Sequence, residues 1–246
     1  TTTNPHLIRE VVLLLKDAGA KVMVGDSSAI ITLPTRKNME RTGIKRISEE
    51  AGAEVVNLEE MGWVKVSPPQ AKFQRSFYIS RLAYEADLIV NLPVIKTHRS
   101  ASYSISLKNF IGILHPRNRP SLYRARRWEE IIAEINLAVH PQLIIADGTK
   151  SMISGGPWRG EAAETGLIMA SGDRVAIDVA GLALIKSFGR WERVTDKSVW
   201  EQRQIRRAVD IGLGAEGLDK IKLVSASLED DPDFPRLMEG IKRNLR

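Results

Sequence analysis

Cysteine is absent from the 246 residues of this sequence. The absence excludes a disulfide, a thiolate nucleophile and a cysteine-based zinc site within the chain. It also excludes an iron–sulfur cluster ligated by the chain's own cysteines. Any such cluster would therefore have to belong to a partner protein.

Long hydrophobic runs are absent as well. The longest, Val11 to Leu15, lies inside an amphipathic pattern and is far shorter than the roughly 20 apolar residues that span a bilayer. No hydrophobic region of a signal peptide is visible, so we expect a cytoplasmic protein without a membrane span. Because the chain starts with three threonines and no methionine, we also expect that a leader or a first strand has been removed.

Acidic residues are outnumbered by basic ones. The 36 lysines and arginines exceed the 30 aspartates and glutamates, which gives a formal net charge of +6. This surplus favours acidic partners, such as phosphorylated metabolites, nucleic acid or an anionic membrane surface.

Much of the positive charge gathers in one segment, residues 112–127, which also holds two prolines and shows no helical or strand periodicity. We expect it to be an irregular basic insertion or flap. Its arginines are Arg117, Arg119, Arg124, Arg126 and Arg127. They could bind nucleic acid, close over an anionic substrate or pair with acidic side chains. No nucleic-acid-binding signature accompanies them, so nucleic acid is not the favoured partner.

Helices and short apolar strands alternate along the chain. We expect helices at 5–18, 37–51, 77–85, 128–139, 173–184 and 198–209 and from 234 onward, and strands at 21–25, 54–58, 63–66, 87–92, 142–146, 166–170 and 220–224. This alternation predicts one α/β domain over residues 1–246, with a mainly parallel sheet and helices on both faces.

Polar clusters follow several of the expected strands. They are Asp26 with Ser27, the segment 91–98, Asp147 with Gly148, and the segment 171–173. Ligands of open α/β sheets bind beyond the carboxyl ends of the strands, so these clusters are expected to lie near one site.

The segment from Asn91 to Gly112 is the most informative. Lys96, Thr97 and His98 offer a cation, a hydroxyl and an imidazole in sequence, and a second lysine follows at Lys108. Two lysines, several serines and a helix N-terminus near Ser102 would form an anion cradle. The alternative is a solvated loop in which a serine simply caps a helix.

These blocks resemble a known family, the domain of unknown function 362 (DUF362) family. Residues 91–98 and 106–112 are similar to its pattern N-x-P-K-x-K-T-H followed by L-K-N-x-x-G. Further similar blocks are Thr3–Pro5 with Gly19–Ala20, Asp147–Gly148 with Met152, Gly156, Pro157 and Gly160, and Ser171–Asp178. The blocks follow the family order and cover nearly the whole chain.

The resemblance implies an α/β fold but no agreed reaction. Family members often occur beside ferredoxin-like iron–sulfur modules, which makes an iron–sulfur protein one candidate partner. The family usually has a strand with a Lys-Pro-Asn motif before the opening threonine, so an N-terminal strand is expected to be missing here. Departures from the pattern are Val94 after the proline, Ile153 and Ser154 in place of a Glu-Gly pair, and Arg174 after Asp173.

The carboxylates have alternative interpretations. Asp173 is more often a helix N-cap than a catalyst. Asp178 lies among apolar helical neighbours, where a carboxylate needs a partner or a ligand. Asp26 and Asp147 end strands, and with His98 they could hold Mg²⁺, Mn²⁺ or iron, although no spacing demands a metal. The cofactor therefore stays unknown.

Our hypothesis is an enzyme, or a ligand-binding relic of one, for a small anion bearing phosphate or carboxylate. The candidate catalytic residues are His98, which would exchange protons, with Lys96 and Asp178. The candidate ligand-binding residues are Asp26, Ser27, Asn91, Thr97, Lys108, Asn109, Asp147, Gly156 and Asp173. Glycines around Gly156 could bind phosphate or form a tight turn. The alternatives are a partner module of an iron–sulfur redox protein and a nucleic-acid-binding protein that uses the segment 117–127.

Overall fold

The computed structural model of the protein describes residues 2–28, 34–228 and 231–246. Its helices are α1 Pro5–Asp17, α2 Thr35–Arg41, α3 Ile44–Glu50, α4 Arg81–Glu85, α5 Ser106–Asn109, α6 Arg119–Tyr123, α7 Trp128–Ile135, α8 Arg174–Ser187, α9 Glu192–Thr195, α10 Arg203–Asp210 and α11 Phe234–Asn244. Its strands are β1 Met23–Asp26, β2 Glu54–Asn57, β3 Trp63–Val66, β4 Phe77–Ser80, β5 Val90–Asn91, β6 Val94–His98, β7 Ser102–Ser104, β8 Leu143–Met152 and β9 Ala162–Ser171.

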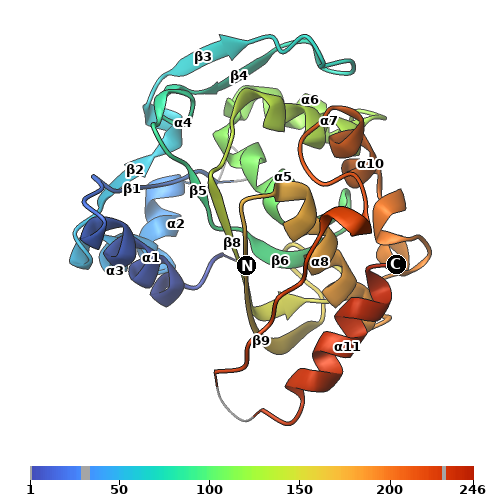
Figure 1. Ribbon diagram of the computed structural model, residues 1–246. Coiled ribbons are helices and arrows are strands. Elements are labelled where there is room, and N and C mark those ends of the chain that lie inside the picture. The colour runs from blue at the N-terminus through green and yellow to red at the C-terminus, as the bar shows by residue number, and fades with distance from the viewer. Residues whose placement is uncertain (1, 29–33, 229–230) are drawn as a thin grey trace.

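The predicted α/β class is confirmed, and the largest sheet is built around β8. This strand pairs in parallel with β5 and β6 and antiparallel with β9, while β6 also pairs antiparallel with β7. β1 and β2 form a separate parallel pair, and β3 and β4 form an antiparallel hairpin that extends at the top of Figure 1. Three of the six strand pairs in the described residues are therefore antiparallel, so the pairing is mixed.

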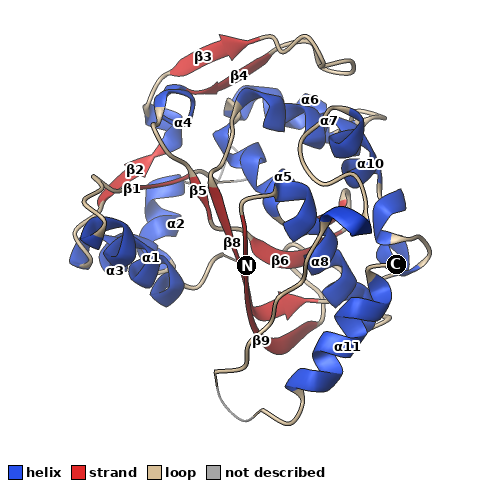
Figure 2. Ribbon diagram, in the orientation of Figure 1, coloured by secondary structure: helices blue, strands red, loops and turns tan. Residues whose placement is uncertain are grey.

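Helix α8 is the centre of the main hydrophobic core. It packs on β6, β8 and β9, and α11 packs against it (Figure 2). Its buried face includes Val175, Val179 and Leu182, which are each fully shielded from solvent. A second, smaller core lies between α1, α2 and α3 and contains Ile8 and Val12.

Local chemistry explains where two helices begin. The Asn4 side chain accepts a hydrogen bond from the His6 amide, and Pro5 occupies the first turn of α1. The Asp173 carboxylate accepts the amides of Val175 and Ala176 at the start of α8, so the expected N-cap is confirmed. The terminal helix from Phe234 is confirmed as well.

Two expected helices are wrong in part. Residues 77–80 form β4, because Phe77 and Ile79 are buried while Tyr78 is exposed, which is the two-residue period of a strand. The helix expected at 37–51 is interrupted at Gly43, whose φ of +79° favours glycine and ends α2 before α3 begins.

Two strand assignments also need correction. We expected a loop after Pro93 and a helix near Ser102, but these residues form β6 and β7. The strand expected at 220–224 is not observed: Leu218–Lys220 forms a 3₁₀ turn, and the following residues pair with no strand in the described part of the chain. The alternating apolar residues of this segment, Ile221 and Leu223, are only half-buried.

A buried carboxylate on α7 holds the segment before β4. Glu134, which is fully buried, accepts the backbone amides of Lys72, Phe73 and Gln74 at 2.9–3.3 Å. It also pairs with Arg207 of α10 at 2.5 Å. One carboxylate thus joins three segments that are distant in sequence.

We predict that Glu134→Gln lowers the free energy of unfolding by about 2 to 4 kcal/mol, because the half-buried Arg207 guanidinium loses its charged partner. Urea unfolding measures the change. The matched control is Glu161→Gln, which removes one partner of an exposed ion pair with Arg190 and should cost less than about 0.5 kcal/mol. Equal effects of the two variants would contradict the structural role of Glu134.

Candidate functional site

Positive charge collects where β6, α5 and the end of β1 meet. Lys96 and His98 come from β6, Lys108 comes from α5, and Asp26 ends β1. Lys96 lies close enough to the other three to influence the pKa of each of them. The structure therefore brings together four of the residues singled out in the sequence.

The pleat of β6 decides which side chains share this site. Lys96, Thr97 and His98 pair in antiparallel register with Ser104, Tyr103 and Ser102 of β7. Successive side chains of a strand point to opposite faces, so Lys96 and His98 lie on one face and Thr97 on the other. The Thr97 hydroxyl is buried and lacks a hydrogen-bond partner.

Lys108 is the most unusual residue of the site. It is 9% exposed, and the described residues provide no hydrogen bond to its ammonium group. The Trp128 ring centroid lies 5.9 Å from Nζ, and the Trp128 indole nitrogen is itself buried without a partner. Burial, together with the charge of Lys96, lowers the pKa of Lys108 to about 7.

Asp26 and Lys96 form an electrostatic couple at the edge of the site. Both are half-buried by exposed area. Protein atoms nevertheless crowd their charged groups, and this desolvation lowers the pKa of Lys96 and raises the pKa of Asp26. Their attraction for each other opposes both shifts, and the Ser27 amide further stabilises the Asp26 carboxylate by donating to it at 2.7 Å.

His98 is held as a neutral imidazole. Its Nδ1 accepts the Ser100 amide at 3.2 Å, so the ring proton belongs on Nε2. Burial and the charges of Lys108 and Lys96 lower the pKa of His98 to about 2. In the ligand-free protein His98 is thus a hydrogen-bond donor through Nε2, and its pKa lies far below the range that suits proton exchange near neutral pH.

Asp178 and Asn91 hold the turn that carries Lys108. The Asp178 carboxylate accepts the amides of Ser106 at 2.6 Å and Leu107 at 3.3 Å, and burial raises its pKa to about 8. Asn91 donates to Ser106 Oγ at 3.0 Å and accepts from the Asn109 side chain at 2.7 Å. The first amides of α5 are therefore occupied by a carboxylate of the protein, and the expected helix N-terminus does not face a ligand.

Arg119 of the basic insertion is a structural residue. It is 1% exposed and donates to the Ser28 carbonyl, the Gly112 carbonyl at 2.9 Å, the Leu114 carbonyl at 2.7 Å and Ser27 Oγ at 2.7 Å. Ser27 in turn donates to the Gly112 carbonyl at 2.5 Å. The other four arginines of the segment are exposed.

The remaining two aspartates satisfy backbone groups elsewhere. Asp147 accepts the Asn4 amide at 2.7 Å and both the amide and the hydroxyl of Thr149. Asp173 accepts the Ala215 amide at 2.7 Å in addition to the first amides of α8. Within the described residues, no three histidine, aspartate or glutamate side chains are arranged to hold a metal ion.

Gly156 lies against the back of β6. A Cβ at this position would come within 2.2 Å of the Thr97 carbonyl oxygen, so only glycine fits. The Gly156 carbonyl accepts the Arg99 amide at 3.2 Å, and its own amide donates to the Arg159 carbonyl at 2.8 Å. The glycine loop therefore supports the strand that carries Lys96 and His98, and its backbone groups are used within the protein.

Sequence reasoning missed what three residues contribute to this site. Arg119 was considered only together with the other arginines of the insertion, Trp128 only as the start of an expected helix, and Ser100 only as one of the serines of the anion cradle. Each contributes through a contact that depends on how separate segments pack. Only the apolar periodicity around Trp128 signalled its burial.

A sequence profile described as "Domain of unknown function (DUF362)" matches residues 1–183. The chain belongs to this family. Among curated proteins it is similar to the thylakoid-associated protein sll1697 of Synechocystis sp. (strain ATCC 27184 / PCC 6803 / Kazusa), with 28% identity over 181 residues. That match covers 72% of this chain and 54% of the relative, so the chain spans about half the length of that DUF362 protein. In the described residues, no helix combines the length and apolar character of a membrane span.

We predict that Lys108→Met stabilises the ligand-free protein near neutral pH. The folded state lowers the pKa of Lys108 from 10.5 to about 7, so burying the ammonium opposes folding most strongly below about pH 7. As the pH rises from about 7 to 10, the wild-type lysine loses its proton and this penalty disappears. The gain of the variant at pH 6.5 should be roughly 2 to 4 kcal/mol and should shrink by pH 9.5.

Urea unfolding at the two pH values, in buffer free of phosphate and sulfate, measures this difference. The control Lys65→Met removes an exposed lysine from β3 and should change little at either pH. A Lys108→Met variant that is equally destabilised at both pH values would show that the ammonium has favourable contacts in the folded protein.

Proposed function

We propose that the protein binds a small anionic molecule through the cluster of Lys96, His98 and Lys108, either as an enzyme or as a ligand-binding domain. The observation that carries this proposal is the buried Lys108 ammonium, which has neither a carboxylate nor a hydrogen-bond acceptor among the described residues. An unpaired buried cation is costly, and a phosphate or carboxylate group would compensate it.

The distribution of charge supports an anion as the ligand. The charge of Lys96 lowers the pKa of Lys108, and the one acidic group that shifts the pKa of either lysine is Asp26, which acts on Lys96. Two positive charges in one site are stabilised together by one negative charge placed between them. The same anion would raise the pKa of both lysines toward their ordinary values.

Two further donors are suited to an oxyanion. His98 presents Nε2–H on the same face of β6 as Lys96, and the buried indole nitrogen of Trp128 neighbours Lys108 without an acceptor. Phosphate and carboxylate oxygens accept such bonds. We therefore assign His98 the role of a hydrogen-bond donor to the anion in the resting protein, with proton exchange reserved for a state in which bound negative charge has raised its pKa.

Asp178 is proposed as a positioning residue. Its carboxylate is fully buried and bonded to the amides of α5, so it acts on a ligand through the placement of Lys108. Asn91 and Asn109 contribute in the same way. Nucleic acid is the weaker proposal, because Arg119 is buried in carbonyl contacts and only the remaining arginines of the insertion are exposed.

We predict that the wild-type protein binds sulfate, an anion whose charge is constant across neutral pH, and that Lys108→Met or Lys96→Met weakens binding at least about tenfold. Each variant removes one of the two lysine cations of the site, and Lys108 is only 9% exposed, so water replaces its ammonium poorly. Isothermal titration calorimetry measures the affinity, and Lys65→Met serves as the matched control. Equal affinities of all four proteins would contradict the site.

We also predict that sulfate affinity falls as the pH rises above about 7. Because the pKa of Lys108 is about 7, its side chain is mostly a neutral amine above that pH and must take up a proton to bind the anion as an ammonium. This proton uptake lowers the affinity up to about tenfold per pH unit. Below pH 7 the lysine is already charged, and the affinity should level off. In Lys108→Met, the remaining sulfate affinity should no longer show this part of the pH dependence. A wild-type affinity that increases with pH would contradict the assignment of Lys108 to the anion site.

A further inference from the structure

Ser102 has an unusual backbone conformation next to the proposed site. Its φ is +62°, which makes it the one non-glycine residue with positive φ in the described ranges 2–28, 34–228 and 231–246. Such a conformation is uncommon for residues other than glycine and persists only when the surroundings hold it. Ser102 begins β7 and pairs directly with His98 of β6.

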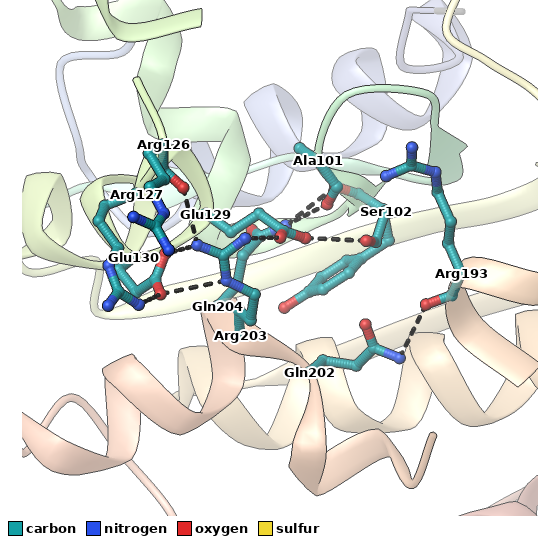
Figure 3. A network of polar contacts seen from close by, with 11 residues as sticks. Ala101, Ser102, Arg126, Arg127, Glu129, Glu130, Arg193, Gln202, Arg203 and Gln204 are labelled. Carbon is teal, nitrogen blue, oxygen red and sulfur yellow. Dashed lines mark hydrogen bonds and ion pairs between the residues drawn. The ribbon is translucent and has the colours of Figure 1, made fainter. Parts of the chain in front are cut away.

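Three side chains bind the backbone and hydroxyl of this turn, and Figure 3 shows two of them, Glu129 and Gln204. The Gln204 amide donates to the carbonyls on both sides of Ser102, those of Ala101 at 2.7 Å and Tyr103 at 3.2 Å. The Trp191 indole donates to the Ser102 carbonyl at 2.8 Å. The Ser102 hydroxyl donates to Glu129 at 2.8 Å.

The residues that hold the turn are themselves fixed. Glu129, on α7, forms an ion pair at 3.2 Å with Arg203, which lies on α10 one residue before Gln204. Gln204 is fully buried, and Ser102 is 7% exposed. Gln204 and Trp191 both lie beyond residue 183, where the match to the DUF362 profile ends.

We propose that Gln204 is a positioning residue of the anion site, which holds the 101–103 turn so that β7 keeps Lys96 and His98 in binding geometry. The proposal rests on the function proposed above. Positive φ at Ser102 turns the Ala101 and Tyr103 carbonyls so that one amide group can reach both. Without that donor, the Tyr103 carbonyl loses its bond to Gln204 and the Ala101 carbonyl keeps only the Tyr103 amide, at 2.7 Å, so that Ser102 can relax to negative φ.

Relaxation of Ser102 would disturb the register of the hairpin. The pairs His98–Ser102 and Lys96–Ser104 depend on where the turn ends. A shifted turn would admit water to the His98 ring and separate the two lysines. Affinity for an anion would fall although no side chain that touches the anion has changed.

The chain offers a matched control in Gln202. This glutamine is also buried and also donates through its amide to two backbone carbonyls, those of Arg193 at 3.2 Å and Val194 at 3.4 Å. Figure 3 shows both glutamines in the same region, with Gln202 directed to the segment of Arg193. Gln202 thus supports α9, whereas Gln204 supports the β6–β7 hairpin.

The experiment compares Gln204→Met with Gln202→Met in the full chain. Both variants should lose similar stability in urea, because each removes one side-chain amide that donates to two backbone carbonyls. Only Gln204→Met should weaken sulfate binding, by about tenfold in calorimetry. Equal weakening in both variants, or none in Gln204→Met, would overturn the proposal.

A second measurement does not depend on any ligand. NMR titration of the His98 ring should show no transition above about pH 4 in the wild type and in Gln202→Met, because the pKa of His98 is about 2. In Gln204→Met the transition should move up toward the ordinary histidine range of about 6.5. If the wild type does not bind sulfate but the His98 transition moves in Gln204→Met, the proposed function is wrong and the positioning role of Gln204 stands. If the transition does not move in Gln204→Met, the positioning role is wrong.

Rescue supplies the decisive comparison. Adding Ser102→Gly to Gln204→Met places a glycine where positive φ carries no steric cost, so sulfate affinity should return to within about threefold of the wild type. A double variant as weak as Gln204→Met would contradict the role of the turn. If Gln204→Met does not fold, Trp191→Phe is the alternative variant, because it removes the bond to the Ser102 carbonyl. It should move the His98 transition in the same direction. An unchanged transition in Trp191→Phe would count against the proposal.

Discussion

The buried contact between the Asp178 carboxylate and the amides of Ser106 and Leu107 determines the geometry of the whole region. It joins α8, the centre of the core, to the short turn that carries Lys108. A carboxylate without a cationic partner in an apolar helix is expensive, and its pKa near 8 reflects that cost. The hydrogen bonds from the two amides offset part of this cost. The first amides of a helical turn have no partner within the turn itself, so they need an acceptor such as this carboxylate.

This contact places a second costly group close by. With α5 fixed, the Lys108 side chain extends into a buried position beside Trp128, where the protein supplies a ring face and no acceptor. A site that carries its charges in place before the ligand arrives avoids reorganisation on binding, at the expense of stability without ligand. Asp178 and Asn91 bind the turn of α5, Gly156 packs against β6, and Gln204 binds the turn between β6 and β7.

Local signals in the sequence were sufficient for several elements. The N-caps at Asn4 and Asp173 and the strand at 54–57 were predicted because capping chemistry and apolar runs are local properties. The strand β6 was missed because Pro93 was interpreted as the end of pairing, whereas the chain resumes pairing with β8 one residue later. The apolar alternation at 220–224 was misleading, since a strand also requires a neighbour.

The same limit applies to the candidate site. Lys96, His98, Lys108 and Asp26 were expected to lie together because they follow or end strands, and the structure does bring them together. Asp147 and Asp173 were likewise expected to follow strands, but Asp147 lies within β8, and both carboxylates accept backbone amides. Whether a carboxylate faces a ligand or an amide depends on atoms that come from segments distant in sequence. The pairing of Gln204 with the Ala101 carbonyl, 103 residues away, is likewise invisible to any local pattern.

Arg119 shows how such a contact restricts the substitutions that a chain can accept. Its guanidinium binds three carbonyls and one hydroxyl, which belong partly to the insertion and partly to the loop after β1, 91 residues earlier. Neither segment can lose its half of this arrangement without leaving buried polar groups unsatisfied in the other. Substitutions in the two segments are therefore expected to accumulate together, and a family member that shortens the insertion needs a different donor to close the end of its first strand.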